Sequence, residues 1–141
     1  MSANNSMVMI GNLVDDVKLR YTNTTNKPVV NGRIAVNEPV RIGNDWSERT
    51  TYLNFVAWDA MAEHVAASVS KGNRIVVSGR LQTREYTPEN GVRQYYTELV
   101  ADEVAVSLRW AIARPDKATG PDLVPASVDA ADVDAVYGEP F

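Results

Sequence analysis

The fold of this chain is decided by residues 74–86, which read RIVVSGRLQTREY. Apolar and polar residues alternate along this stretch, and that pattern predicts a β-strand. Side chains of a strand point alternately to its two faces, so one face carries Arg74, Arg80, Arg84 and Tyr86. Thirteen residues at about 3.3 Å each make a strand of roughly 40 Å, longer than a small barrel requires. We therefore expect its far end to protrude as a hairpin arm.

The rest of the body predicts four more strands and one helix. Asn90-Gly91 is a strong turn signal, after which residues 92–103 return beside the first strand. Upstream, the pattern predicts an opening strand over 8–21 with a bulge at Gly11, a second strand from Val30, a polar loop at 38–49 and a third strand at 50–58. The helix follows Asp59, its expected N-cap, because Ala62, Val65, Ala66 and Val69 have helical spacing.

Three strands, a helix and two strands is the element order of the OB-fold, a five-stranded barrel that commonly binds oligonucleotides. The fold class is therefore predicted to be all-β. We expect one OB-fold domain over residues 1–112, with the helix between its third and fourth strands, and a disordered tail over 113–141.

An extra extended segment is expected at the end of the body. Its apolar residues recur at every second position: Val104, Val106, Leu108, Trp110 and Ile112. A five-stranded barrel is already complete without it, so this strand is predicted to cover a neighbouring subunit. The alternative is an amphipathic helix, which the alanines at 105, 111 and 113 would favour.

Charge is divided unequally between body and tail. Residues 113–141 hold six acidic and two basic residues, whereas residues 1–112 hold twelve of each. The net charge of −4 therefore lies entirely in the tail, which ends in Glu139, Pro140 and Phe141. Such a segment cannot build a core and is placed to be bound by another molecule.

The composition argues against several classes of protein. The chain has no cysteine and a single histidine, so no thiolate metal site is expected, and no metal or other cofactor. No Gly-rich phosphate loop or converging set of catalytic groups is visible, so we do not expect an enzyme. No apolar run approaches a membrane span or a signal peptide, and a soluble cytoplasmic protein is expected.

Binding of a single nucleic-acid strand requires cations along the phosphates and aromatic rings that stack on bases. The predicted outward positions supply both: Trp58, Tyr86, Tyr52, Trp46, Arg33, Arg41, Arg49, Lys71, Arg74, Arg80 and Arg84. The competing interpretation places Tyr52 and Trp58 in the core and pairs Arg84 with Glu85 as a weak surface ion pair.

Several blocks resemble bacterial single-stranded DNA-binding proteins. They are MIGNL at 9–13 with DVKLRY at 16–21, FVAW at 55–58, AEHV at 62–65, KGNRIVVSGRL at 71–81, TREY at 83–86 and the tip EPF at 139–141. Each block alone is weak, but their ordered combination is specific. DEV at 102–104 with SLRWA at 107–111 looks most like the actinobacterial branch.

The resemblance implies a homotetramer that binds single-stranded DNA without sequence preference and associates with the nucleoid. Its tip, Glu139-Pro140-Phe141, would recruit replication, recombination and repair proteins, and the extra strand would clamp the subunits together. Trp58 and Tyr86 match stacking aromatics of the family, and Tyr52 stands where many members have tryptophan.

Two departures from the family pattern predict weaker or more salt-sensitive binding. Val40 stands where some members have a further stacking tryptophan, so that contact is missing or has moved to Trp46. Glu85 occupies a position that is often basic. Two other functions remain open: an OB-fold interaction module of the primosome-adaptor type that mainly binds proteins, and an RNA-binding OB module.

Overall fold

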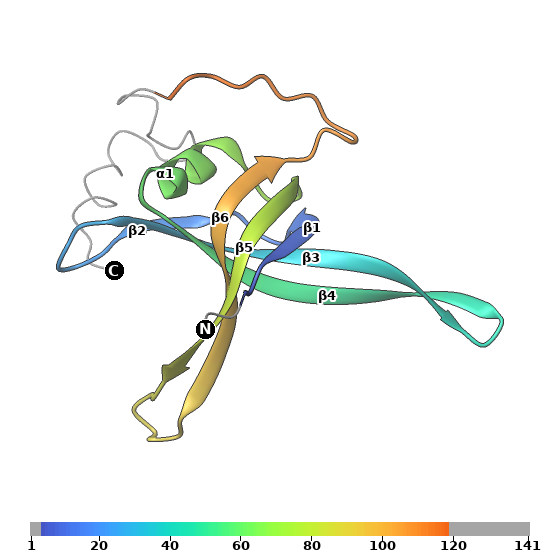
Figure 1. Ribbon diagram of the computed structural model, residues 1–141, viewed down its shortest axis with the longest axis horizontal. Coiled ribbons are helices and arrows are strands. Elements are labelled where there is room, and N and C mark those ends of the chain that lie inside the picture. Colours follow the sequence, from blue (N-terminus) through green and yellow to red (C-terminus); the bar gives the residue numbers. More distant parts are fainter. Residues whose placement is uncertain (1–3, 119–141) are drawn as a thin grey trace.

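The computed structural model describes residues 4–118 of the 141-residue chain. These residues form six strands and one helix (Figure 1). The elements are β1 (Met7–Leu13), β2 (Lys18–Tyr21), β3 (Pro28–Ile42), β4 (Asp45–Trp58), α1 (Asp59–Ser68), β5 (Arg74–Tyr86) and β6 (Gln94–Val106). Within residues 4–118, no helix has the length and apolar character needed to cross a membrane.

The strands form one sheet that closes on itself. Their order is β1-β5-β6-β4-β3-β2, and β1 also pairs with β3 through Asn12↔Ala35 and Leu13↔Ile34. The closed ring contains β1, β3, β4, β5 and β6, while β2 pairs with β3 outside it. A five-stranded barrel with a helix between its third and fourth strands is the OB-fold architecture. The predicted fold class, all-β with an OB-fold barrel, is confirmed.

Aliphatic side chains and one phenylalanine fill the interior of the barrel. The largest fully buried side chains are Phe55, Ile34, Ile75, Leu99, Val29, Val30 and Val77. All of them except Val29, drawn from β3, β4, β5 and β6, belong to one core cluster, to which helix α1 adds Ala62 and Val65. Full burial of one such aliphatic or aromatic side chain contributes about 1.5–3 kcal/mol. This core fixes which face of each strand points outward.

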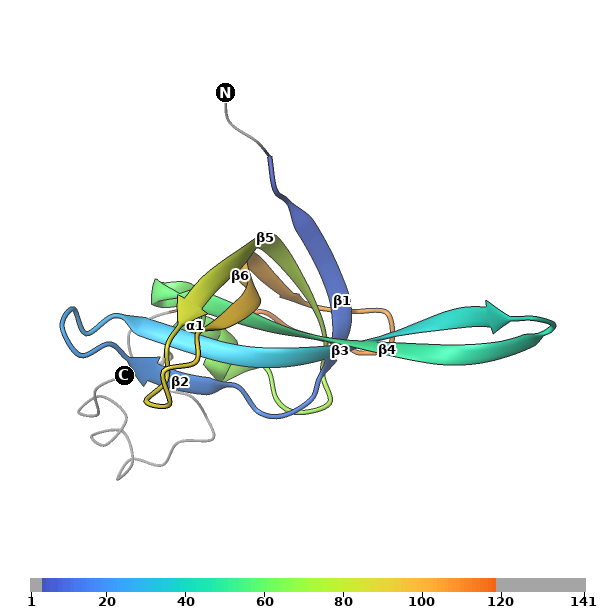
Figure 2. The ribbon, with the colours of Figure 1, turned by 90° about the horizontal axis from the view of Figure 1, so that it is seen from below.

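A long hairpin of β3 and β4 replaces the polar loop that the sequence indicated at 38–49. Only Gly43 and Asn44 connect the two strands, since Ile42 pairs directly with Asp45. Gly43 has a φ of +64°, a conformation that tight hairpin turns use and that glycine adopts without strain. The loop prediction was wrong because the outer part of this hairpin has both faces exposed, which removes the usual alternation. The hairpin forms an arm that extends far from the barrel (Figures 1 and 2).

The hairpin of β5 and β6 forms a second arm, as the sequence predicted. Pairing continues outward to Tyr86 and Gln94, and in the turn the N–H of Gly91 donates to the carbonyl of Pro88. Figure 1 shows this arm leaving the barrel in a different direction from the β3–β4 arm.

Gly11 marks a close approach of two backbones, and the expected bulge at this residue was wrong. β1 keeps a continuous register with β5, whereas an irregularity between β5 and β6 lies at Ser78/Gly79. A Cβ on Gly11 would overlap the backbone carbonyl of Ala35 on β3. Glycine therefore allows β1 to contact β3 closely enough to close the barrel.

Helix α1 begins directly at the end of β4. Trp58 is the N-cap residue in an extended conformation, and no side chain caps the helix by a hydrogen bond. The prediction of Asp59 as N-cap was therefore wrong, because no connecting residues separate strand from helix. Asp59 is instead the first helical residue, with a φ of +62°.

The prediction of a separate strand over residues 104–112 was wrong. Val104 and Val106 belong to the end of β6, residues 107–118 contain neither strand nor helix, and the strand outside the ring is β2. The N–H of Ser107 still donates to the carbonyl of Arg74, the first residue of β5. Residues after Ser107 would extend past the beginning of β5, so they have no β5 residue to pair with. A strand needs a partner for its backbone groups.

Gly79→Val should destabilise the barrel. A Cβ at this position would overlap the backbone carbonyl of Val100 on β6, so the larger side chain must force the two strands apart. We expect the free energy of unfolding to fall by about 1–3 kcal/mol or more, measured by denaturant titration. Ser78→Val is the matched control, because its side chain is on the outer face, and it should cost less. Equal losses in the two variants would contradict the close-approach argument.

Candidate nucleic-acid interface

Strand register joins the outward residues of four strands into one surface. Arg33 of β3 pairs with Asn54 of β4, Val56 of β4 pairs with Val100 of β6, and Arg80 of β5 pairs with that same Val100. Residues paired across neighbouring strands have side chains on the same side of the sheet. We call this surface the four-strand face. Its polar and aromatic members include Arg33, Tyr52, Asn54, Trp58, Arg80, Arg84, Tyr86, Tyr96 and Glu98.

The β3–β4 part of this face carries exposed rings beside an arginine. Tyr52 is 53% exposed and Trp58 is 39% exposed, whereas the intervening Phe55 and Ala57 are fully buried. The guanidinium carbon of Arg33 lies 4.6 Å from the centre of the Tyr52 ring, within cation–π range. Tyr52 and Trp58 are therefore surface residues, and the alternative that places them in the core is wrong.

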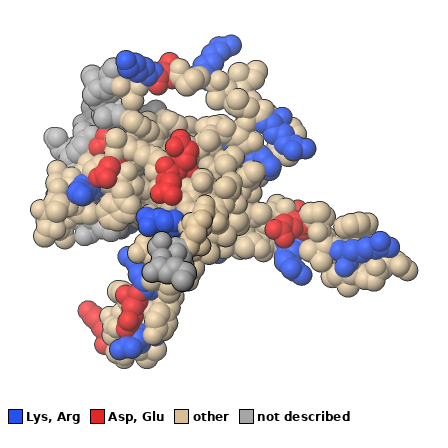
Figure 3. Space-filling view, in the orientation of Figure 1, with Lys and Arg blue, Asp and Glu red and all other residues tan. Residues whose placement is uncertain are grey.

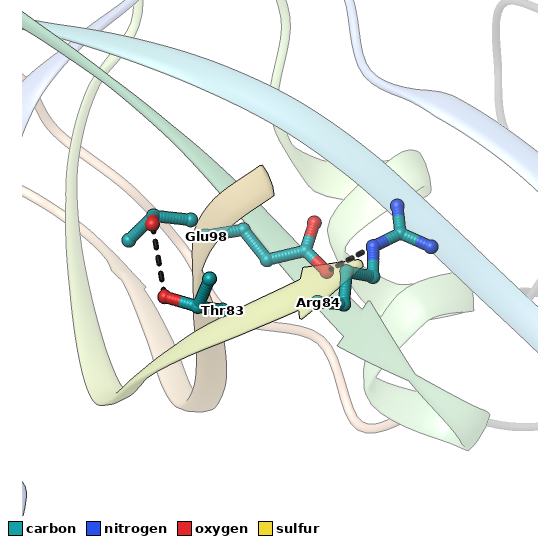
Figure 4. Close-up of polar contacts among 4 residues, drawn as sticks. Thr83, Arg84 and Glu98 are labelled. Carbon is teal, nitrogen blue, oxygen red and sulfur yellow. Dashed lines mark hydrogen bonds and ion pairs between the residues drawn. The ribbon is translucent and has the colours of Figure 1, made fainter. Parts of the chain in front are cut away.

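The β5–β6 part combines an arginine, a glutamate and two tyrosines. Nε of Arg84 lies 3.1 Å from Oε1 of Glu98 (Figure 4). The guanidinium carbon of Arg84 lies 6.0 Å from the centre of the Tyr96 ring. Tyr86 is 54% exposed on the same side of β5. Arg84 and Tyr96 are register partners, so the returning strand supplies half of this cluster.

The expected ion pair between Arg84 and Glu85 does not form. Consecutive residues of a strand point to opposite faces, and Glu85 faces away from the four-strand face. It forms an ion pair with Arg93 there, while Thr83 and Thr97 share a hydrogen bond on the same side. The acidic residue at this often basic family position is therefore neutralised locally.

The β3–β4 arm carries Trp46, Arg41 and Arg49. Trp46 is 70% exposed and pairs in register with Arg41, which places the two on one side of the arm. Arg49 pairs with Glu38 and, by alternation, lies on the other side. Figure 3 shows basic side chains toward the end of this arm.

Trp46 does not occupy the position of the missing family tryptophan. Val40 pairs with Ser47, so Val40 and Trp46 have side chains on opposite sides of the arm. A base that stacked on Trp46 would therefore approach the arm from a different direction.

Two of the predicted basic residues, Lys71 and Arg74, lie away from the aromatic and arginine residues of the four-strand face. Lys71 is in the turn after α1, where its backbone N–H donates to Oδ1 of Asp16. Arg74 is six residues before Arg80 on β5, roughly 20 Å along the strand. Its guanidinium carbon is 4.7 Å from the Trp110 ring centre, and its Nε is buried without a hydrogen-bond partner.

Sequence reasoning missed Tyr96 and Glu98. Both lie on β6 opposite the basic positions of β5, and only the register of the hairpin assigns them to the four-strand face. The seven residues of the turn, 87–93, do not fix that register from sequence. The sequence therefore carried no independent signal for them, because the side of β6 on which they lie follows only from the pairing of Arg84 with Tyr96.

Two apolar surfaces lie outside the four-strand face. One is on β1, where Val8 and Ile10 are exposed although they lie on a barrel strand. The other is the segment after β6, where Leu108, Trp110 and Ile112 are exposed. The five predicted oligomer residues therefore fall into two groups. Val104 and Val106 are partly buried against the core, whereas Leu108, Trp110 and Ile112 are exposed.

The tip residues Glu139, Pro140 and Phe141 lie outside the described residues. Among residues 4–118, no group of three or more histidine, cysteine, aspartate or glutamate side chains is arranged to hold a metal ion.

Known proteins are similar to this chain in sequence. Residues 4–107 match the Single-strand binding protein family. A single-stranded DNA-binding protein of Paenarthrobacter nicotinovorans is 37% identical over 120 residues, covering 83% of this chain and 70% of the relative. Proteins of the same name are 40% identical in Clostridium tetani over 75% of this chain and 71% of the relative, and 32% identical in Mycobacterium leprae over 84% and 72%.

The fold is an OB-fold barrel, and aromatic and arginine side chains are exposed across four of its strands. These are features of the class of OB-fold proteins that bind oligonucleotides. The chain belongs to the single-strand binding protein family, and its relatives include actinobacterial members. The resemblance inferred from the sequence blocks is confirmed.

Proposed function

We propose that this protein binds single-stranded DNA without sequence preference along the four-strand face. The observation that carries the proposal is the continuity of this face, on which Trp58, Tyr52, Tyr86 and Tyr96 are exposed among arginines. The names of the relatives support the choice of single-stranded DNA as the ligand. Binding of this kind would protect the strand and remove its secondary structure.

Stacking is the main source of affinity in this proposal. Every base has a flat ring face, so an aromatic side chain gains about 1–3 kcal/mol per stacked base whatever the sequence. Trp58 and Tyr86 come from different hairpins, which meet where β4 pairs with β6. A strand that stacks on both rings must therefore cross the barrel surface rather than follow one arm.

Arginines on the same face supply the phosphate contacts. Arg80 has no ion-pair partner within residues 4–118, whereas Arg84 is already paired with Glu98. Each neutralised phosphate of a single strand releases counterions and contributes about −0.7 to the slope of log affinity against log salt. The body has no net charge, so we expect a moderate slope and a large share of affinity from stacking.

Loss of both predicted stacking rings should weaken binding strongly. Trp58→Ala combined with Tyr86→Ala removes two stacks, so we expect a loss of about 2–6 kcal/mol in binding free energy. Fluorescence anisotropy with labelled dT oligomers at two salt concentrations measures it, and U oligomers of equal length test the RNA alternative.

Tyr95→Ala is the matched control for this pair of variants. Tyr95 is on the same hairpin and is exposed, but it pairs with Glu85 on the side away from the four-strand face. Its removal should leave affinity nearly unchanged. Feeble binding of the unaltered protein to dT would instead favour the adaptor function, and equal effects of the two sets of variants would disprove the assigned face.

We further propose that the protein is a homotetramer. Its support is the two exposed apolar surfaces, Val8 with Ile10 on β1 and Leu108 with Trp110 and Ile112 after β6. Large exposed apolar side chains that occur close together along a segment are candidates for interaction sites. In this proposal residues 107–112 become a clamp strand only when a second subunit provides the missing backbone partner.

Replacing Leu108, Trp110 and Ile112 together by serine should loosen the tetramer, because it removes the apolar contacts of the clamp. Light scattering over a dilution series should show dissociation at concentrations where the unaltered protein remains tetrameric. Deletion of residues 119–141 is the control and should reduce the mass only by the deleted segment in each subunit. A triple variant that remains tetrameric on dilution would show that the clamp assignment is wrong.

We also propose that the tip recruits replication, recombination and repair proteins. Its support is chemical: Phe141 offers an apolar anchor, Pro140 restricts the conformation of the chain, and the acidic residues before it suit a basic rim. Only Glu139 is directly adjacent to Pro140-Phe141, so we expect modest affinity.

Deletion of Pro140 and Phe141 should abolish capture of such enzymes on immobilised protein, because the anchor is lost. Affinity for dT should not fall, since the four-strand face is intact. Replacement of Tyr137 by alanine is the matched control, because it removes an aromatic ring outside the tip. Undiminished capture after the deletion would contradict the role of the tip.

A further inference from the structure

A buried carboxylate lies on the face that we assign to a polyanion. Glu98 is on the four-strand face, yet only 8% of its surface is exposed. A buried carboxylate is unfavourable unless it is paired, and beside phosphates it would also repel the ligand. Its presence there therefore requires a compensating interaction, and Arg84 provides one.

The ion pair binds only one of the three guanidinium nitrogens of Arg84. Oε1 of Glu98 lies 3.1 Å from Nε, while the Arg84 side chain remains 62% exposed and the Glu98 side chain only 11%. Figure 4 shows the two terminal amino groups pointing away from Glu98. Those two groups retain the planar fork geometry that matches the oxygens of a phosphate.

Two aromatic side chains lie on the same side of the arm as this guanidinium. Tyr96 lies directly opposite Arg84 on β6, with 6.0 Å between the guanidinium carbon and its ring centre. Tyr86 is two residues further along β5 on the same side. A phosphate at Arg84 would therefore lie between bases stacked on neighbouring rings.

We propose that Glu98 is a positioning residue, whose buried carboxylate holds Nε of Arg84 so that the terminal amino groups bind a backbone phosphate between Tyr86 and Tyr96. This inference rests on the proposed binding of single-stranded DNA. An unrestrained arginine on an exposed arm samples many rotamers, and each contact must order it again. Glu98 orders it before the ligand arrives, because its own side chain is only 11% exposed and is itself held in place.

The proposal and simple electrostatics predict opposite changes in DNA affinity when Glu98 is replaced. Glu98→Gln removes one negative charge from the binding face, and on charge alone affinity for DNA would rise. If Glu98 positions Arg84, the affinity falls instead, by about three- to tenfold, because a neutral amide holds the guanidinium less firmly. Fluorescence anisotropy with a short labelled dT oligomer in low salt measures the change.

Glu85→Gln is the matched control. It removes the same charge from the same hairpin and also breaks an ion pair with an arginine, but on the opposite side. Its affinity should stay equal to that of the unaltered protein or rise slightly. Thermal unfolding of both variants shows whether either change disturbs the fold.

Glu98→Gln made in a protein that already carries Arg84→Ala distinguishes a positioning role of Glu98 from a merely structural one. With Arg84→Ala present, Glu98→Gln has no guanidinium to release and instead removes an unpaired buried carboxylate, so affinity should rise. A merely structural role would weaken binding in both backgrounds. If Glu98→Gln fails to fold, Arg84→Lys tests the same proposal. It keeps the positive charge but loses the Nε–H and the planar pair of terminal amino groups, so it should also bind three- to tenfold more weakly.

The outcomes separate this inference from the function on which it rests. If the unaltered protein does not bind dT, the proposed function fails. If it binds dT but Glu98→Gln binds equally well or more tightly, the function stands and the positioning role is overturned. Unchanged affinity in Arg84→Lys would overturn it as well.

Discussion

The parallel pairing of β4 with β6 is the contact on which the rest of the molecule depends. Phe55 pairs with Leu99 and Val56 with Val100, and this short ladder joins the hairpin of β3 and β4 to that of β5 and β6. Phe55 and Leu99 are fully buried, so the hydrophobic effect holds the two hairpins in one register. With that register fixed, Val56 and Val100 must face outward together. The continuity of the four-strand face is thus a consequence of core packing.

The chemistry of this face depends on local neutralisation more than on total charge. The body has equal numbers of acidic and basic residues, and two of its arginines are paired on the β5–β6 arm. Arg84 is paired on the four-strand face through Glu98, and Arg93 is paired on the other side through Glu85. A face built in this way exposes aromatic rings and arginines without a large net positive charge. It suits a ligand that is held mainly by stacking.

Particular elements show how far sequence reasoning reached. Strict alternation in β5 correctly predicted a strand, an arm and the outward side of Arg80, Arg84 and Tyr86, because side-chain period is a local property of extended backbone. The same logic failed at residues 38–49, where both faces are exposed and no alternation remains. It also failed after Val106, where apolar alternation predicted a strand but residues 107–118 form neither strand nor helix.

The sequence by itself determined the OB-fold class, the aromatic and basic residues of the outward faces, and the separation of an acidic tail from a neutral body. These follow from local periodicity and composition, which do not depend on how distant segments meet. Only the tertiary structure decided that Tyr96 lies opposite Arg84, that Glu98 is buried beneath that arginine, and that Trp46 and Val40 face opposite ways. Those relations are set by register between strands. Register is fixed by the turns together with the shared core, and the core is assembled from segments that are far apart in the sequence.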